Sequence, residues 1–276
     1  MQKPDPLRLL GCQVAIPDVG SVGHRDRHVA SVCERIANHL AESGPVDLIV
    51  LPELCTITYS REAFEMLDDL AEPLDGPSVI RFAELARAES AMVVFGMARR
   101  TDTGFRISQV MLSETGKGVA CYDKMHLCQY GASCEKEFFE RGEKMAVVDL
   151  KGWKIAPLIC YDIRIPEMTR ALVLEHHADL LLHCGAYFRD ESFATWHSFA
   201  TTRAMENQTY LLSINRAGSD YGNSLFCSPW MDENHPAVAF AEHAEQFRIF
   251  ELNPDLPVNT RSMYTFLKDR HAKYPL

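Results

Sequence analysis

A cysteine stands where a predicted strand gives way to a predicted helix. Residues 154–159 form a short apolar run, Cys160 follows directly, and Pro166 suits the first turn of a helix, where its missing N–H is not needed. In such a turn, free backbone N–H groups and the positive helix end favour the thiolate, the reactive form of cysteine. Cys160 is therefore a candidate nucleophile. The alternative is a small buried side chain, which is the usual state of a free cysteine.

Two more side chains with useful chemistry follow apolar strands. Residues 46–51 lead to Glu53, and residues 119–122 lead to Lys124. If these strand ends meet the one before Cys160, a carboxylate base, a cation and a thiol share one site. Attack on an amide carbonyl requires this combination, because it needs a nucleophile, a proton acceptor and a group that stabilises the oxyanion. Each charged residue alone would more often form a surface ion pair.

In these settings the chain resembles the nitrilase superfamily of carbon–nitrogen hydrolases. The resemblance is carried by LPEL around Glu53, YDKMHL around Lys124 and LICYDIRIPE around Cys160, and it continues over nearly the whole chain. It implies a Glu–Lys–Cys triad in which Cys160 forms a thioester and Glu53 moves protons. Lys124 and a backbone N–H near Tyr161 would hold the oxyanion.

The resemblance also implies a second glutamate, a few residues before a glycine. Glu135 and Glu137 both precede Gly142, and the spacing favours Glu135. Its expected role is to orient Lys124 or the substrate rather than to transfer protons.

The candidate substrate-binding residues are Tyr161, Arg164 and Tyr59. Arg164 lies on the turn after the nucleophile, where a guanidinium could bind a substrate carboxylate through two hydrogen bonds. It could equally pair with Glu167 or Asp162 and only brace the turn. The two roles predict different substrate dependence, so they can be separated by experiment.

These residues favour hydrolysis of a small linear amide that carries a carboxylate, with release of ammonia, as in ω-amidases and deaminated-glutathione amidases. The alternatives are an N-carbamoyl amide hydrolase, a true nitrilase, or a non-catalytic binding protein of the same fold. Residues 183–185 (His-Cys-Gly) and 231–233 (Met-Asp-Glu) depart from the family pattern. Pocket walls are expected at both segments, so the sequence does not name the substrate.

Composition indicates a cytoplasmic enzyme. A formal net charge of −10 without a basic cluster argues against a nucleic-acid partner. No apolar run has the length of a membrane span, and no secretory signal is expected at the start. The nine cysteines are odd in number and spread through predicted strands and helices, which favours reduced thiols. No cofactor or metal is predicted. A zinc site made of Cys121, Cys128, Cys134 and His126 is the one specific alternative, and their spacings match no common zinc pattern.

Strands and helices alternate along the 276 residues without an internal linker. Strands are expected at 7–15, 46–51, 92–99, 106–113, 119–122, 154–159, 179–183, 209–214, 237–241 and 246–252. Helices are expected from about residue 26, near 61–70, from Pro77, from Pro166 and around Trp196. Pro157 removes one backbone donor from its strand and predicts an edge or a bulge there.

This order fits two sheets packed face to face with helices outside. The resemblance implies the same arrangement, an α/β four-layer α-β-β-α sandwich that dimerises through helices. We expect one carbon–nitrogen hydrolase domain at residues 1–257. The polar tail, residues 258–276, is expected to pack on a partner subunit of a homodimer or higher homo-oligomer.

Overall fold

Two six-stranded sheets form the centre of the molecule in the computed structural model, which describes residues 4–271 and 273–275. In spatial order the first sheet contains β12 (Gln246–Leu252), β1 (Leu7–Gln13), β2 (Leu48–Val50), β3 (Met92–Arg100), β4 (Phe105–Leu112) and β5 (Gly118–Asp123). The second contains β11 (Val238–Ala239), β10 (Leu225–Cys227), β9 (Tyr210–Ile214), β8 (Leu180–Cys184), β7 (Trp153–Ile159) and β6 (Val148–Leu150).

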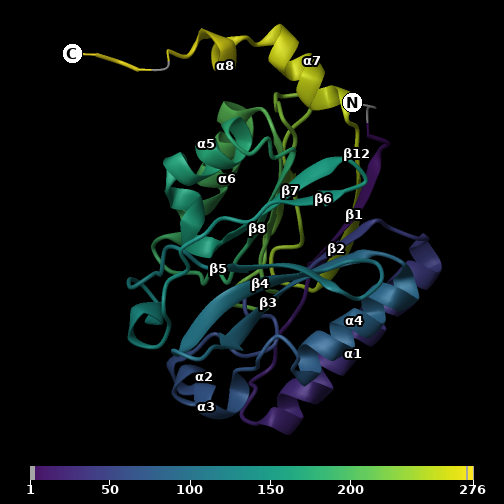
Figure 1. The fold of residues 1–276 in the computed structure, drawn as a ribbon, viewed down its shortest axis with the longest axis vertical. Coiled ribbons are helices and arrows are strands. Elements are labelled where there is room, and N and C mark those ends of the chain that lie inside the picture. Colours follow the sequence, from purple (N-terminus) through teal and green to yellow (C-terminus); the bar gives the residue numbers. More distant parts are fainter. Residues whose placement is uncertain (1–3, 272, 276) are drawn as a thin grey trace.

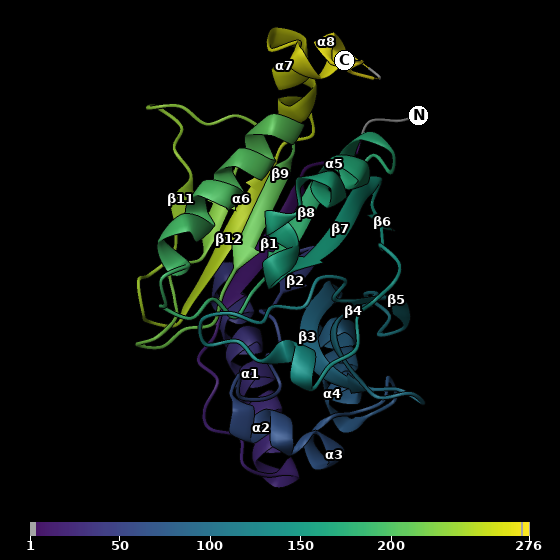
Figure 2. The same cartoon turned by 90° about the vertical axis from the view of Figure 1, so that its left-hand side faces the viewer.

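Helices cover the outer face of each sheet (Figures 1 and 2). The first sheet is covered by α1 (Val22–Ser43) and α4 (Pro77–Glu89), and the second by α5 (Pro166–Leu174) and α6 (Phe193–Asn207). The shorter elements are α2 (Arg61–Glu65), α3 (Leu67–Leu70), the 3₁₀ turns η1 (Glu135–Glu137) and η2 (Cys160–Arg164), α7 (Asp255–Met263) and α8 (Phe266–Asp269). The helices that start at Pro77 and Pro166 carry proline in their first turn, as the sequence predicts.

Three apolar clusters separate the four layers. Side chains of a strand alternate between its two faces, so Leu9 packs between the sheets whereas Leu10 packs against the α1 side. In β8, Leu180 and Leu182 likewise face the other sheet, and Leu181 faces α5 and α6. The predicted α-β-β-α sandwich is thereby confirmed.

Some element boundaries differ from the sequence prediction. α1 begins at Val22 rather than near residue 26, because the Ser21 hydroxyl caps it by accepting from the His24 N–H. The stretch predicted as one helix at 61–70 is two short helices that meet at Met66. β7 lies inside its sheet, yet β6 pairs only with residues 153–155, so Pro157 has an unpaired neighbour position on one side, as expected of a proline in a strand.

The tail projects from one end of the sandwich (Figures 1 and 2). The predicted boundary at residue 257 falls inside α7. Tyr264 attaches the tail to the domain, because its carbonyl accepts from the Gln208 amide at 2.7 Å and its ring stacks on Trp230 at 3.7 Å. Along the described ranges, no helix is both long and apolar enough to cross a membrane.

Candidate active site

Glu53 follows β2 on a tight loop that passes very close to β3. A Cβ atom on Gly96 of β3 would lie 2.5 Å from the Pro52 carbonyl and 2.6 Å from the Leu54 nitrogen, so only glycine permits this approach. The buried Arg216 guanidinium holds the same loop by donating to the carbonyls of Leu54 at 2.7 Å and Glu53 at 3.3 Å. The loop backbone is therefore held on both sides by contacts that do not involve the Glu53 side chain.

Lys124 follows β5 and is also held through its backbone. The Gly142 N–H donates to the Lys124 carbonyl at 2.8 Å, which returns the segment containing Glu135 to the end of β5. A Cβ atom on Gly142 would lie 2.1 Å from the Asp123 carbonyl oxygen, so this contact also requires glycine. The spacing between Glu135 and Gly142 thus has a physical basis in how the chain returns to Lys124.

The ammonium of Lys124 lies between two carboxylates. Its Nζ is 2.7 Å from Glu53 Oε1 and 2.6 Å from Glu135 Oε1, and all three side chains are completely buried. Glu135 also accepts from the Tyr59 hydroxyl at 2.5 Å and from the Cys128 N–H at 2.9 Å. Each Glu135 oxygen is therefore engaged, which suits a residue that orients Lys124.

The neighbouring Glu137 has a different position. It is exposed and pairs with Arg61 at 2.8 Å on the surface. Of the two candidates for the second glutamate, Glu135 is the one that contacts Lys124.

Cys160 lies at the end of β7, where the strand becomes the turn η2. Its φ of 45° is in the left-handed region, which is uncommon for a residue with a side chain. Asp162 stabilises the turn: its buried carboxylate accepts from the Ile159 N–H at 3.0 Å, from the Tyr122 hydroxyl at 2.6 Å and from the His126 N–H at 3.1 Å. Because Tyr122 and His126 flank Lys124 in sequence, Asp162 joins the end of β5 to the end of β7.

Burial and charge set the protonation states of these groups. Burial raises the pKa of the Glu53 carboxyl from 4.5 to about 7, against the opposing charge of Lys124. Burial alone would lower the pKa of Lys124, but Glu135 and Glu53 outweigh it and raise that pKa well above its usual value. A permanent ammonium next to an exchangeable carboxyl is a suitable arrangement for proton transfer.

The Cys160 thiol does not have the lowered pKa that its turn predicts. It opens partly onto a pocket, but burial and then the Glu53 charge hold the pKa of this thiol well above its usual value. The expectation of a resting thiolate is therefore wrong, because enclosure and a neighbouring carboxylate outweigh the N–H groups of the turn. A thiol in this state can act as a nucleophile only if a base removes its proton.

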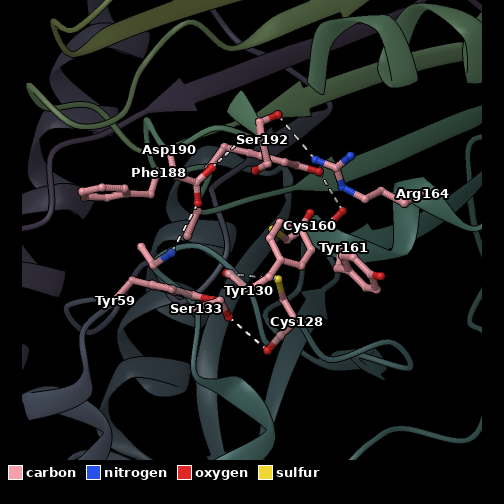
Figure 3. A pocket seen from close by; sticks show the side chains of 13 residues that line it. Tyr59, Cys128, Tyr130, Ser133, Cys160, Tyr161, Arg164, Phe188, Asp190 and Ser192 are labelled. Carbon is pink, nitrogen blue, oxygen red and sulfur yellow. Dashed lines mark hydrogen bonds between the residues drawn. The ribbon is translucent and has the colours of Figure 1, made fainter. Parts of the chain in front are cut away.

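Cys160 lies in a pocket of about 380 Å³, including its mouth. Figure 3 shows the side chains around it, with Tyr161 and Arg164 on one side and Tyr59 and Phe188 on the other. The three predicted substrate-binding residues, Tyr59, Tyr161 and Arg164, all line this pocket. The remaining wall comes mainly from two loops, 128–133 and 186–192.

Arg164 reaches the pocket without a carboxylate partner among the described residues. Its guanidinium makes long contacts to the Thr195 hydroxyl at 3.3 Å and the Ser192 carbonyl at 3.5 Å. It also lies over the Phe199 ring, 4.8 Å from the centroid. Its Nε is buried without a hydrogen-bond partner in the part of the chain that the structure describes. The predicted pairing with Glu167 or Asp162 is absent here.

The two segments that depart from the family pattern do not line the pocket. The expectation that they form its walls is wrong, since His183 lies beneath Cys160 and Met231 packs against the core cluster on the α5 and α6 side. The sequence patterns also do not predict site roles for Asp162, Tyr187 or Arg216. The rule that functional groups follow strands would have found Arg216, which comes two residues after the end of β9. No sequence signal would have found Tyr187, which lies on the loop after β8.

The described residues do not bring candidate metal ligands together. Within residues 4–271 and 273–275, no set of three or more His, Cys, Asp and Glu side chains has the geometry to hold a metal ion. All nine cysteines are free thiols.

Comparison with known proteins identifies the class. The crystal structure of Nit3 from Saccharomyces cerevisiae, described as a member of branch 10 of the nitrilase superfamily, is similar to this chain. The two are 23% identical with a TM-score of 0.82, and the match covers 95% of each chain. The four-layer sandwich is thus a nitrilase fold. Residues 15–234 match the carbon–nitrogen hydrolase family.

Two curated relatives are named amidases. The chain is 34% identical over 176 residues to the omega-amidase YafV of Escherichia coli, a match that covers 63% of each chain. It is 30% identical over 251 residues to an (R)-stereoselective amidase of a Pseudomonas species, covering 89% of this chain and 88% of that relative. The chain therefore belongs to the carbon–nitrogen hydrolase family and is an enzyme of the amidase type.

Proposed function

We propose that this enzyme hydrolyses a small linear amide that bears a carboxylate, through a thioester on Cys160, and releases ammonia. The observation that carries the proposal is the buried cluster of Glu53, Lys124 and Glu135, whose charges all act on the Cys160 thiol at the pocket. The amidase names of the relatives support the reaction class. Arg164 supports the carboxylate.

The reaction begins with a neutral thiol and an ionised Glu53. As the Cys160 sulfur attacks the amide carbon, its proton passes to Glu53, whose pKa near 7 suits both acceptance and release of a proton at neutral pH. The C–N bond then breaks, and Glu53 gives this proton to the departing ammonia. Water attacks the thioester with Glu53 again as base, and the carboxylic acid and free thiol are formed. Protonation of Glu53 also leaves Lys124 and Glu135 as a balanced ion pair.

Oxyanion stabilisation comes from Lys124 and a backbone donor. An ammonium has three hydrogens, and two of those on Lys124 go to Glu53 and Glu135. The third is available for the oxyanion, together with the N–H of Tyr161. A donor of this kind is typically worth ~3–4 kcal/mol of transition-state stabilisation.

Arg164 gives the substrate its orientation. Its present contacts are long, so a bidentate carboxylate would replace them with shorter, charge-assisted hydrogen bonds. The rest of the pocket wall is largely aromatic, with Tyr59, Tyr130 and Phe188. This suits the short carbon chain that separates a carboxylate from a terminal amide.

Replacement of the nucleophile tests the mechanism. Cys160→Ala and Cys160→Ser should both abolish ammonia release while circular dichroism stays unchanged, because an alkoxide is far harder to form than a thiolate at neutral pH. Cys128→Ser is the matched control, since Cys128 lines the same pocket and its contact with Glu135 is made by the backbone N–H, which the substitution keeps. Turnover at the wild-type rate in Cys160→Ala would contradict the proposed mechanism.

Substrate class is tested with paired compounds. In wild type and Arg164→Ala, kcat/KM is measured for a carboxylate-bearing amide and its neutral analogue, next to N-carbamoyl compounds and nitriles. Loss of the guanidinium should raise KM for the charged amide alone, and Arg164→Lys should restore little, because a point charge cannot reproduce the planar fork. Equal proportional losses on both amides would leave Arg164 as a brace of the turn.

We also propose the setting in which the enzyme works. Nine free thiols suit a reducing cytoplasm. The projecting helix α7 exposes Val258 by 62% and Met263 by 73%, which supports a tail that packs on a second copy beyond a single domain at 1–257. Sedimentation of the full chain and of a chain ending at residue 257 tests this, and an unchanged dimer in the shorter chain would exclude the tail as the contact.

A further inference from the structure

The backbone carbonyl of Cys160 receives hydrogen bonds from two side chains, His183 beneath Cys160 and Tyr187 in the pocket wall. His183 Nε2 lies 2.9 Å from this oxygen, and the Tyr187 hydroxyl donates to it at 2.9 Å. His183 is fully buried and Tyr187 is 5% exposed. Because a carbonyl oxygen only accepts, His183 must carry its hydrogen on Nε2.

Further partners fix this tautomer of His183. The Trp196 indole N–H donates to Ser213 Oγ at 2.8 Å, and Ser213 Oγ lies 2.7 Å from His183 Nδ1. An indole N–H only donates, so the Ser213 oxygen accepts from Trp196 and its own hydrogen goes to Nδ1. Burial lowers the pKa of His183 to about 4, so the ring is neutral at neutral pH. Tyr187 is placed by stacking on Trp196, with ring centroids 4.5 Å apart and planes at 6°.

These contacts orient the peptide unit between Cys160 and Tyr161. A trans peptide is planar, and its C=O and N–H point in opposite directions. Two donors on the Cys160 oxygen therefore fix the direction of the Tyr161 N–H. They also polarise the amide, since hydrogen bonds strengthen one another along a chain. The left-handed φ of Cys160 gives this plane an orientation that the residue would not adopt without support.

We propose that His183 and Tyr187 are positioning residues for the oxyanion site, which aim and polarise the Tyr161 N–H through the Cys160 carbonyl. This inference rests on the proposed function, which gives that N–H the role of oxyanion donor. It assigns a purpose to the histidine at position 183, where the chain departs from its family pattern.

Tyr187→Phe is the primary test. It removes one hydroxyl and keeps the ring that stacks on Trp196. We expect kcat for amide hydrolysis to fall about tenfold with KM unchanged, less than the roughly 10²–10³-fold typical of direct loss of an oxyanion donor. Tyr210→Phe is the matched control, because it removes another buried hydroxyl. That hydroxyl donates to the Asn253 carbonyl at 3.1 Å, and neither residue lines the pocket. Its kcat should equal that of wild type.

A second pair of variants tests the histidine. His183→Gln retains an amide N–H that can reach the Cys160 carbonyl, whereas His183→Leu does not. The glutamine variant should keep at least tenfold more kcat than the leucine variant. Equal kcat in the two would overturn the role of the Nε2 hydrogen.

Alkylation of Cys160 by iodoacetamide separates this role from a general loss of structure. That reaction occurs at a saturated carbon and forms no oxyanion, and mass spectrometry identifies the modified cysteine. Tyr187→Phe should alkylate within about twofold of wild type while its kcat falls. A parallel fall in both rates, or an unchanged kcat, would overturn the proposal. Turnover retained by Cys160→Ala would instead overturn the proposed function, whatever Tyr187→Phe shows.

Discussion

Asp162→Asn should destabilise the fold because of the number of hydrogen bonds that its carboxylate accepts. One oxygen accepts from the Ile159 N–H and the Tyr122 hydroxyl, and the other from the N–H and Nδ1 of His126. Asparagine keeps one oxygen, but its NH₂ group would face two donors in a site with no solvent access. Each hydrogen bond to a charged group is worth about 1.5–3 kcal/mol. Loss of two gives about 3–6 kcal/mol, a large part of the roughly 5–15 kcal/mol that stabilises a typical domain.

The same change should reduce activity in the protein that remains folded. Asp162 connects the end of β5, which precedes Lys124, to the turn that carries Cys160. A displacement of about 1 Å in such a geometry can lower a rate 10²-fold. Urea unfolding followed by circular dichroism measures the stability, and ammonia release at about 25 °C measures the activity.

Tyr122→Phe is the graded control for Asp162→Asn. It removes one donor to the Asp162 carboxylate and retains the ring, so it should cost about 1.5–3 kcal/mol. A loss below about 1 kcal/mol for Asp162→Asn would refute the reasoning from hydrogen bonds. So would a larger loss for Tyr122→Phe than for Asp162→Asn.

Four further predictions follow from the buried cluster and its loops. The pKa of Glu53 is raised from 4.5 to about 7, and its ionised form is the base in the proposed mechanism, so kcat/KM should fall as pH drops below about 7. The folded state binds this proton more tightly than the unfolded state does, so Glu53 should add stability as pH falls from about 7 to 4.5. The urea midpoint of the wild type minus that of Glu53→Gln should therefore rise over this range, and a difference that falls would contradict this. Gly96→Ala should cost about 1–3 kcal/mol in thermal unfolding and lower kcat, because its Cβ would strike backbone atoms next to Glu53, whereas Gly20→Ala, with nothing within 4 Å, should be silent. Glu135→Gln should lower kcat at least tenfold and Glu137→Gln should not, and similar rates in the two would remove the orienting role of Glu135.

Local sequence patterns were sufficient for most of the fold. The runs before Glu53 and Cys160 are strands whose apolar residues are buried. The run before Lys124 is a strand at the edge of its sheet, in which only Tyr122 is buried. The start of α1 was missed because its first turn carries no apolar periodicity, and only the Ser21 cap marks it. The break at Met66 was missed since apolar residues continue across it.

The chemical state of the site depended on contacts that sequence does not contain. The short motif around Cys160 predicts a thiolate from local N–H groups alone. The enclosing pocket and Glu53 come from distant segments and reverse that prediction. The roles of His183 and Tyr187 likewise depend on how β8 lies beside β7, which is a matter of sheet order rather than of any motif.

The pocket wall and the groups proposed to react come from different parts of the chain. Loops 128–133 and 186–192 form much of the wall, whereas Glu53 and Lys124 lie behind it with no exposed surface. Side chains on these loops that make no hydrogen bond to the cluster, such as Ala132 and Phe188, can be exchanged without touching the proton-transfer groups. The enzyme is therefore a good starting point for directed evolution of substrate range, with libraries confined to the outer loops.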